Sequence, residues 1–489
     1  MSTTTYEKKG SIKNGIGRMI FSVLVLLLEA IFLLMIFSYL NKYAVWINTV
    51  TGVVALLLVL ALYGSNINSS MRMPWIILIL VAPILGVGLY LVVGLNSKTH
   101  KMRNRYAKIN EVLIPLLSEN REEVNDCAYE KLKEDHKDLS TISNYIWKNS
   151  AYPVYSNSDI TYFSSAIEGL EAQKEAMKKA KKFILFEYHA IEDDIAWHGI
   201  FEIMKEKAKE GVEVKVFYDD MGSIGFINTD FIERLEKNGI SCRVFNPFAP
   251  GLNLFLNNRD HRKITVIDGE VGFTGGYNIA NEYFGITEPF GKWKDTGVKI
   301  EGEAVRSLTI AFFENWNAIK KSKTVVSKED ITKYLPNVSY EKKEAGGFIQ
   351  PYADSPMDEE YLGENVYISI INNAKDYCYF ITPYLIITDE MIHAFGLAAK
   401  RGVDVRVVTP GIPDKKVIYS VTRSYYNTLT RNGVEVYEWT PGFCHCKMCV
   451  SDDVVATCGT INLDYRSLYH HFENGCMYMD CKAVLDTKK

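Results

Sequence analysis

Two stretches of the sequence carry the same pattern of polar residues. In each, a histidine is followed by a lysine two residues later, then by an aspartate, a glycine and an asparagine at the same spacing. The first copy comprises His261, Lys263, Asp268, Gly275 and Asn278, and the second comprises His445, Lys447, Asp452, Gly459 and Asn462. Histidine can attack phosphorus or carry a proton, while lysine and asparagine donate hydrogen bonds to an anion. Two such sets around one tetrahedral anion suit the chemistry of a phosphodiester.

The spacing indicates how these side chains are presented. Residues two apart in a β-strand face the same side, so the histidine and lysine of each copy are predicted to project together. Gly276 and Thr460 follow the motif glycines, and these small pairs allow close approach of the backbone. If the two copies pack with pseudo-two-fold symmetry, both sets of side chains converge on one site.

Strands and helices alternate around both copies. Strands predicted at 182–188 and 212–218 flank a helix at 195–209, and the order returns with strands at 377–384 and 403–408 around a helix at 390–400. KAKEGVEVKVF in the first part resembles AAKRGVDVRVV in the second, so an internal duplication is expected. The predicted fold is two pseudo-symmetric α/β halves, each a central mixed sheet flanked by helices. A connector and the first half cover residues 109–335, and the second half covers residues 336–489.

Residues 1–108 are predicted to form a membrane region. Apolar runs occupy 19–40, 44–63 and 75–95, each long enough as a helix to cross about 30 Å of hydrocarbon. Glu29 interrupts the first run, which makes it the weakest candidate. A basic cluster at 98–108 places the following domain in the cytoplasm by the positive-inside rule. Basic residues also precede the first run, and the sidedness of the N-terminus therefore stays open.

Composition narrows the function classes. The formal net charge is −4, so the general basic excess of a nucleic-acid-binding protein is absent. Nine cysteines form an odd number in a long chain, which indicates free thiols in a reducing compartment and not a disulfide framework.

The duplicated pattern resembles the signature of the phospholipase D superfamily. Within that superfamily, the chain is similar to bacterial cardiolipin synthases over almost its whole length. The segments that carry the resemblance are NRDHRKITVIDG, FTGGYNIANEY, TRSYYNTL and GTINLDYRSLYHHFE. Most members of that family have two N-terminal spans, so the run at 19–40 is a departure from the family pattern.

The resemblance implies a covalent mechanism in the bacterial plasma membrane, without a cofactor or a metal. One histidine attacks the phosphorus of phosphatidylglycerol, and the other protonates the departing glycerol and then activates a second phosphatidylglycerol. By analogy His261 is the nucleophile and His445 the acid and base, with this order left open. The resemblance places Lys263, Asp268, Lys447 and Asp452 in the catalytic set with the two histidines, the aspartates as structural residues in preference to proton carriers. Lys263, Lys447, Asn278 and Asn462 are expected to bind the phosphate, and Asp295 and Glu473 to orient the histidine rings.

Other interpretations compete with this one. The alternatives are a hydrolytic phospholipase D, a nuclease of the same superfamily, a transferase with another acceptor and an inactive membrane scaffold. His470 and His471 lie outside the motif, and each is interpreted either as a structural residue or as a residue of the site. Zinc binding at Cys444, His445, Cys446 and Cys449 is rejected, because the motif claims His445 and alternation points the neighbouring thiols away from it. Asp219 and Asp220 are interpreted as a loop and not as a metal site. The oligomeric state is not predicted.

Overall fold

The computed structural model describes residues 44–65, 69–91, 97–118, 122–247, 257–319, 327–337, 340–344 and 346–489, with some residues between 20 and 35. Arg105–Pro247 and Asn258–Lys489 belong to one compact unit, called here the two-sheet unit. The described residues before Arg105 belong to a second unit, called here the N-terminal unit.

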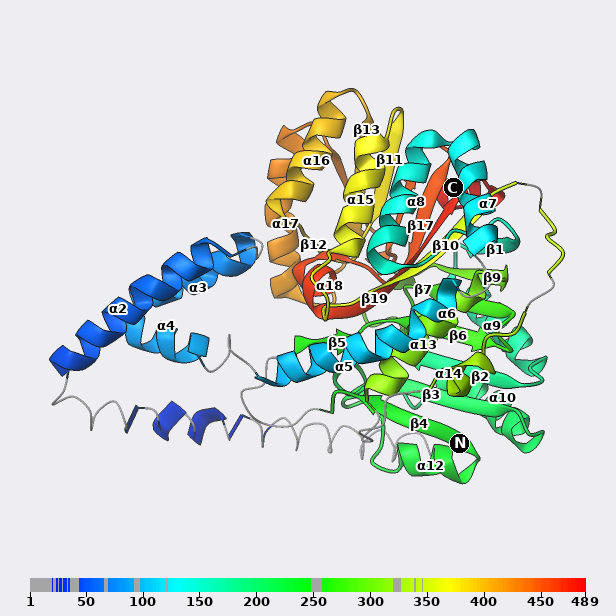
Figure 1. The fold of residues 1–489 in the computed structure, drawn as a ribbon, viewed down its shortest axis with the longest axis horizontal. Helices are drawn as coiled ribbons and strands as arrows, with labels where there is room; N and C mark the ends of the chain where they lie inside the picture. The colour runs from blue at the N-terminus through cyan, green and yellow to red at the C-terminus, as the bar shows by residue number, and fades with distance from the viewer. Residues whose placement is uncertain are drawn as a thin grey trace. The chain divides into compact units, whose positions relative to one another are not determined.

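A seven-stranded sheet and an eight-stranded sheet form the centre of the two-sheet unit (Figure 1). Seven strands of the second follow the same order as the first, while its eighth strand, β5 (Arg259–Asp260), pairs with β19. The first has the order β1-β9-β7-β6-β2-β3-β4, with β1 Ser158–Phe163, β2 Phe183–Tyr188, β3 Glu213–Asp219, β4 Ile240–Phe245, β6 Lys263–Ile267, β7 Val271–Gly275 and β9 Gly297–Gly302. The second has the order β10-β19-β17-β16-β11-β13-β14, with β10 Phe348–Asp354, β11 Tyr377–Ile381, β13 Asp404–Pro410, β14 Glu435–Trp439, β16 Met448–Ser451, β17 Val455–Gly459 and β19 His471–Met479. Along this shared order, three neighbouring strands of each sheet are parallel and the others antiparallel. The prediction of two α/β halves with mixed sheets is confirmed.

Helices cover both sheets, so the central strands are buried on both faces. All six residues of β2 are buried, for example, and its sequence FILFEY is almost continuously apolar. The helices of the first half are α9 Ala166–Lys178, α10 Ile195–Lys209, α11 Asp220–Ser223, α12 Phe231–Lys237, η4 Asn281–Phe284, α13 Val305–Ala318 and α14 Lys328–Thr332. Those of the second half are α15 Leu362–Asn373, α16 Asp389–Lys400, α17 Lys416–Arg431, α18 Tyr465–His470 and α19 Lys482–Lys488. The connector contributes α5 Ser97–Leu113, α6 Pro115–Ser118, α7 Glu122–Asp135 and α8 Lys137–Ser150.

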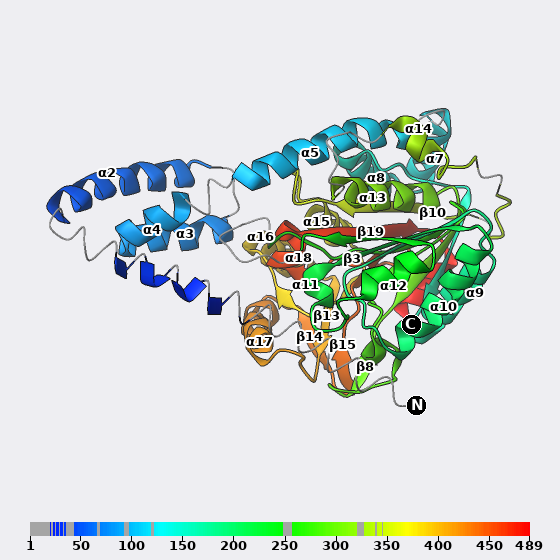
Figure 2. The same ribbon diagram turned by 90° about the horizontal axis from the view of Figure 1, so that it is seen from below.

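Short strands tie the two halves together. β5 (Arg259–Asp260) of the first half pairs with β19, and β15 (Gly442–Cys444) of the second half pairs with β8 (Lys292–Lys294). A third short pair, β12 (Leu385–Ile386) with β18 (Leu463–Asp464), lies within the second half. Helix α13, buried along most of its length, packs on strands of both sheets and lies beside β10 (Figure 2). The motif histidines follow β5 and β15, so this cross-pairing determines where they meet.

The N-terminal unit contains α2 Ala44–Tyr63, α3 Ser69–Val81 and α4 Pro83–Leu89. The single helix predicted over 75–95 is wrong, because the chain breaks between α3 and α4 at Ala82 and Pro83. Proline has no amide hydrogen and restricts the residue before it, so Ala82 leaves the helical conformation with φ −135° and ψ 74°. At 1.5 Å per residue, α3 and α4 are only about 20 and 10 Å long.

Three membrane spans were expected from the sequence. The run at 19–40 lies largely outside the described residues, while the run at 44–63 is helix α2. In the part of the chain that the structure describes, no helix has both the length and the hydropathy needed to cross a membrane.

Candidate active site

Each motif histidine lies just before a strand, on a segment held by the other half. The main-chain N–H of His261 donates to the carbonyl of Phe472 at 2.9 Å, and that of His445 donates to the carbonyl of Lys294 at 2.8 Å. The prediction that each histidine and lysine share one strand is wrong, because β6 begins only at Lys263 and β16 begins after the second lysine. The histidine amides bond across the halves and not along their own sheets, so the chain leaves the sheet at these points.

A carboxylate from the opposite half contacts each histidine ring. Both oxygens of Glu473, on β19, lie 2.9 Å from His261 Nδ1. Asp295, after β8, places Oδ2 2.8 Å from His445 Nδ1. All four side chains are buried. A partner on Nδ1 fixes the ring and leaves Nε2 available to a substrate.

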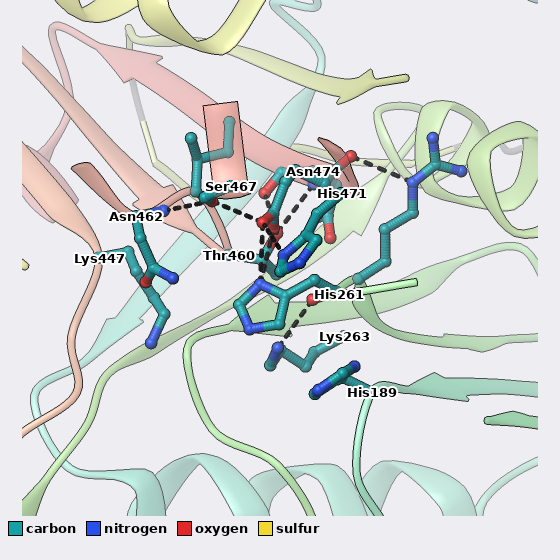
Figure 3. A network of polar contacts seen from close by, with 12 residues as sticks. His189, His261, Lys263, Lys447, Thr460, Asn462, Ser467, His471 and Asn474 are labelled. Atoms are coloured by element: carbon teal, nitrogen blue, oxygen red, sulfur yellow. Dashed lines mark hydrogen bonds and ion pairs between the residues drawn. The ribbon is translucent and has the colours of Figure 1, made fainter. Parts of the chain in front are cut away.

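Glu473 is the centre of a polar network, drawn in Figure 3. Besides His261, the hydroxyl groups of Thr460 and Ser467 donate to its two oxygens. Burial by itself would raise the pKa of Glu473, but His261 and its hydrogen bond hold that pKa below the ordinary value. Glu473 is therefore an ionised acceptor facing the Nδ1–H of His261.

The surroundings of His445 are different. Its Nδ1 lies 2.7 Å from Lys447 Nζ as well as near Asp295, and Lys447 also donates to the carbonyl of His445. Asp295 accepts one further bond, from the main-chain N–H of Thr296 at 2.8 Å. Burial raises the pKa of Asp295 to about 7. The His445 ring thus faces groups that can supply a proton to Nδ1, unlike the ring of His261.

Burial also shifts the basic groups of the site. It lowers the pKa of His261 to about 3 and that of His445 well below its ordinary value. Burial, reinforced by the charge of Lys447, lowers the pKa of Lys263 to about 7, and burial likewise lowers the pKa of Lys447. After burial, the charges of Lys447, Lys263 and His261 lower the pKa of His445, and Figure 3 draws Lys447 and Asn462 of the second copy near His261 and Lys263 of the first.

The asparagines occupy corresponding positions but have different partners. Asn278 Nδ2 donates to the hydroxyl of Tyr283 at 2.8 Å, and its Oδ1 accepts from the main chain of Ala190. Asn462 has a buried Oδ1 without a hydrogen-bond partner among the described residues. Lys263 Nζ donates to the carbonyl of His261 at 2.7 Å, so this ammonium lies beside the ring. The asparagine and lysine donors together can surround one anion.

The motif aspartates lie away from the reacting groups. Asp268 accepts hydrogen bonds from the main-chain N–H groups of residues 181–183 at 2.7–2.9 Å, immediately before or at the start of β2. Asp452 accepts the equivalent bonds from residues 375–377 at 2.8–3.0 Å, at the start of β11. Both adopt positive φ, 55° and 53°, a conformation that aspartate tolerates better than most residues. Each carboxylate thus anchors the turn after its motif strand to the neighbouring strand.

Two further histidines lie at the site, one of them not considered from the sequence. His189 follows β2, and its ring centroid lies 5.0 Å from that of His261. The ring of His471, the first residue of β19, lies 5.4 Å from His261 on another side (Figure 3). The sequence contained a signal for each of them. His189 follows a predicted parallel strand, where ligand sites are common, and His471 lies two residues before Glu473 and so faces the same side of its strand.

Arg262 was also missed, because a single arginine next to a motif gives no sequence signal. It is fully buried and donates to Glu314 Oε2 at 2.7 Å and to the carbonyls of Ala311, Asp354 and Glu473. The residue after His261 therefore links the two halves.

One cluster in the described part of the chain has the spacing of metal ligands. Its members are His261, His471 and Glu473, whose ligand atoms lie within 4.8 Å of one another. A metal there would displace the Nδ1 proton that Glu473 accepts. Asp219, interpreted from the sequence as a loop residue and not a metal ligand, accepts hydrogen bonds from Arg259, Gly222 and Asp260. These bonds hold β5 in place.

Comparisons with known proteins give the family of the chain and a similar fold. The family model described as "Cardiolipin synthase, PLD-like domain" matches residues 174–316 and 367–488. An uncharacterized protein of Streptococcus mutans is 40% identical over 88% of this chain and 91% of its own length. A cardiolipin synthase of Halalkalibacterium halodurans is 32% identical over 87% of this chain and 82% of its own. The fold is similar to that of a phosphatidylserine synthase of Haemophilus influenzae, with a TM-score of 0.53 at 17% identity, over 71% of this chain and 88% of the other.

Proposed function

Since the chain belongs to the family of cardiolipin synthases with phospholipase D-like domains, we propose that it transfers a phosphatidyl group between two phosphatidylglycerol molecules. The products are cardiolipin and glycerol. The observation that carries the proposal is the pair of buried histidines, each held at Nδ1 by a carboxylate from the other half.

The first step is attack on phosphorus by one histidine. The ring of His261 donates its Nδ1–H to the ionised Glu473, which leaves a lone pair on Nε2. As this nitrogen bonds to phosphorus, the bond between phosphorus and the glycerol oxygen breaks on the opposite side. The phosphatidyl group is then attached to His261, and the departing oxygen needs a proton.

His445 supplies that proton. Its Nδ1 faces the ammonium of Lys447 and the carboxyl group of Asp295, whose pKa burial raises to about 7. Donors at Nδ1 favour the tautomer that carries its proton on Nε2, which is the form of a general acid. The difference between the two rings supports His261 as the nucleophile and His445 as the acid.

The second step reverses the first with a different alcohol. When His445 gives its Nε2 proton to the glycerol oxygen, Nδ1 takes a proton from Asp295 or Lys447, so the ring stays neutral. Nε2 then accepts the proton of a hydroxyl group of the second phosphatidylglycerol, and Nδ1 returns its proton to the donor. The resulting oxygen attacks phosphorus and releases His261. Lys263, Lys447, Asn278 and Asn462 hold the non-bridging phosphate oxygens and stabilise their charge in both transition states.

We further propose that the enzyme acts at the bacterial plasma membrane, with the two-sheet unit on the cytoplasmic side. Helices α2 and α3 expose large apolar side chains; Leu57, Leu60 and Leu80 are 59–61% exposed. Contiguous exposed apolar surface marks a site of interaction with lipid or protein. A lipid substrate and a site closed to water favour a lipid hydroxyl as the second attacker.

The reaction can be tested with vesicles of phosphatidylglycerol and the full-length enzyme. We expect cardiolipin and free glycerol in equal amounts, with a chelator present and without CTP or ATP, since one phosphodiester replaces another. Phosphatidic acid as the main product would identify a hydrolase. A requirement for CDP-diacylglycerol would contradict the proposed mechanism.

A further inference from the structure

The loop between β13 and α17 carries a carboxylate that the two catalytic steps do not use. Asp414 accepts a hydrogen bond from the hydroxyl of Tyr384 at 2.6 Å through Oδ2. Lys415 Nζ lies 3.5 Å from the same carboxylate oxygen and 3.4 Å from the Tyr384 hydroxyl. The Asp414 side chain is only 15% exposed, yet no hydrogen bond to its Oδ1 is found among the described residues. This carboxylate can therefore accept further hydrogen bonds.

The loop lies next to His445. The ring of Tyr384 is 6.3 Å from that of Phe443, which is 5.8 Å from the ring of His445. The pKa of His445 is lowered mainly by burial and by the charges of Lys447, Lys263 and His261, and to a smaller extent by the charge of Lys415. The ends of parallel strands such as β13 are the usual position for ligands in α/β sheets. Asp414 and Tyr384 thus lie near His445, the residue proposed to protonate the leaving alcohol.

The corresponding loop of the first half is occupied by the protein itself. Asp219, at the end of β3, accepts hydrogen bonds from Arg259, Gly222 and Asp260, which fill both of its oxygens. The halves share one topology, and the position of Asp219 at the end of β3 is taken by Pro410 at the end of β13, so Asp414 lies four residues further along its own loop. The protein thus uses both oxygens of Asp219, whereas among the described residues only Oδ2 of Asp414 accepts a hydrogen bond.

We propose that Asp414 and Tyr384 form a subsite for the glycerol headgroup of phosphatidylglycerol, beside His445. Glycerol has neighbouring hydroxyl groups, and a carboxylate can accept a hydrogen bond from each of them. The hydroxyl of Tyr384 and the ammonium of Lys415 hold Asp414 in position. The subsite rests on the proposed function and defines its alcohol as a polyol, both when glycerol leaves and when the headgroup of the second lipid enters.

A site that hydrogen-bonds a hydroxyl group rejects analogues that lack it, because its own polar groups are then left unpaired. The test uses full-length enzyme, vesicles of phosphatidylglycerol, and either labelled glycerol or 1-propanol as the competing acceptor. Asp414→Asn should lower the ratio of kcat/KM for glycerol to kcat/KM for 1-propanol at least 10-fold, because the departure of glycerol from the donor lipid is common to both reactions and cancels in this ratio. Tyr384→Phe, which keeps the ring, should shift the same ratio in the same direction by a smaller factor.

Asp404→Asn is the matched control. Asp404 lies at the other end of β13 and accepts a bond of similar length, 2.7 Å, from Tyr379. This variant should leave the ratio of glycerol to propanol unchanged. Equal losses with both acceptors in the Asp414 and Tyr384 variants, or no loss with either, would overturn the subsite.

The proposed function has its own readout, since wild-type enzyme that makes only phosphatidic acid would contradict it whatever the variants do. Wild-type enzyme that makes cardiolipin, with an acceptor ratio unaffected by Asp414→Asn, would contradict the subsite alone.

Discussion

In the proposed mechanism, the catalytic residues work as pairs drawn from opposite halves. Glu473 of the second half orients His261 of the first, and Asp295 of the first half orients His445 of the second. Neither half alone contains a histidine with its orienting carboxylate, so the reaction needs both. The two histidines have different partners at Nδ1, and the proposed mechanism derives their different roles from this difference.

The pairing predicts how substitutions of the histidines combine. His261→Ala and His445→Ala should each lower cardiolipin formation by about 1,000-fold or more, and the double variant should be little worse than either. Nucleophile and acid serve the same chemical steps, so removing one makes the other useless. The measurement is cardiolipin formed from phosphatidylglycerol vesicles, with the exposed His393→Ala as control. Substantial activity in either single variant would argue against a shared site.

Lys263 predicts a link between activity and stability. Burial and the charge of Lys447 lower its pKa from 10.5 to about 7 in the folded protein. Between these pH values the unfolded chain binds a proton that the folded chain lacks, so the free energy of unfolding rises with pH through this window. Below pH 7 the buried charge has its full destabilising effect.

Lys263→Met should therefore abolish most activity but raise the melting temperature by several degrees at pH 6–7. The gain should shrink as the pH rises toward 10.5. Thermal unfolding across this range measures it, with the exposed Lys178→Met as a control that should show no such trend. A gain in melting temperature that does not depend on pH would mean that the pKa of Lys263 is not lowered in the folded protein.

At the scale of elements, the cross-paired strands and the motif aspartates do different work. β5 pairs with β19 and β15 with β8, and these short pairs bring the histidines to the boundary between the sheets. Asp268 and Asp452 hold each motif turn against the neighbouring strand. Each motif therefore contains both the residues proposed to react and an aspartate that stabilises the turn beside them.

Asp268→Ala and Asp452→Ala should each lower the free energy of unfolding by about 2 kcal/mol or more, because each leaves three main-chain N–H groups without their charged acceptor. Chemical denaturation measures the loss. Asp453→Ala is a suitable control, since this neighbour also has positive φ. Among the described residues, its carboxylate accepts hydrogen bonds from the side chains of Tyr377 and Lys488, and its main-chain N–H donates to the hydroxyl of Tyr377. Full stability combined with lost activity would instead make the aspartates proton carriers.

At the scale of the whole molecule, the cysteines report on which side of the membrane the two-sheet unit lies. All nine are free thiols, and Cys127 is the one that is exposed. If the two-sheet unit is cytoplasmic, a thiol reagent that cannot cross membranes should leave Cys127 unlabelled in intact cells and label it after permeabilisation. Cys127→Ser should remove most of the signal, since the other thiols are buried or half-buried. Labelling of Cys127 in sealed cells would reverse the orientation.

Residue types and spacing by themselves determined much of this protein. The duplicated motif, the two α/β halves and the helix over 44–63 follow from local patterns, because strand alternation, helix periodicity and motif spacing are properties of short segments. Pro83 was a local signal as well, and it broke a run that hydropathy alone treated as continuous.

Only the tertiary structure decided which residues meet. It pairs each histidine with a carboxylate of the other half, and it brings His189 next to His261 and Asp414 next to Tyr384. It also removes the histidines from the strands in which alternation placed them. The physical reason is that these contacts join residues far apart in the chain, through backbone pairing between halves whose register depends on the packing of the complete core.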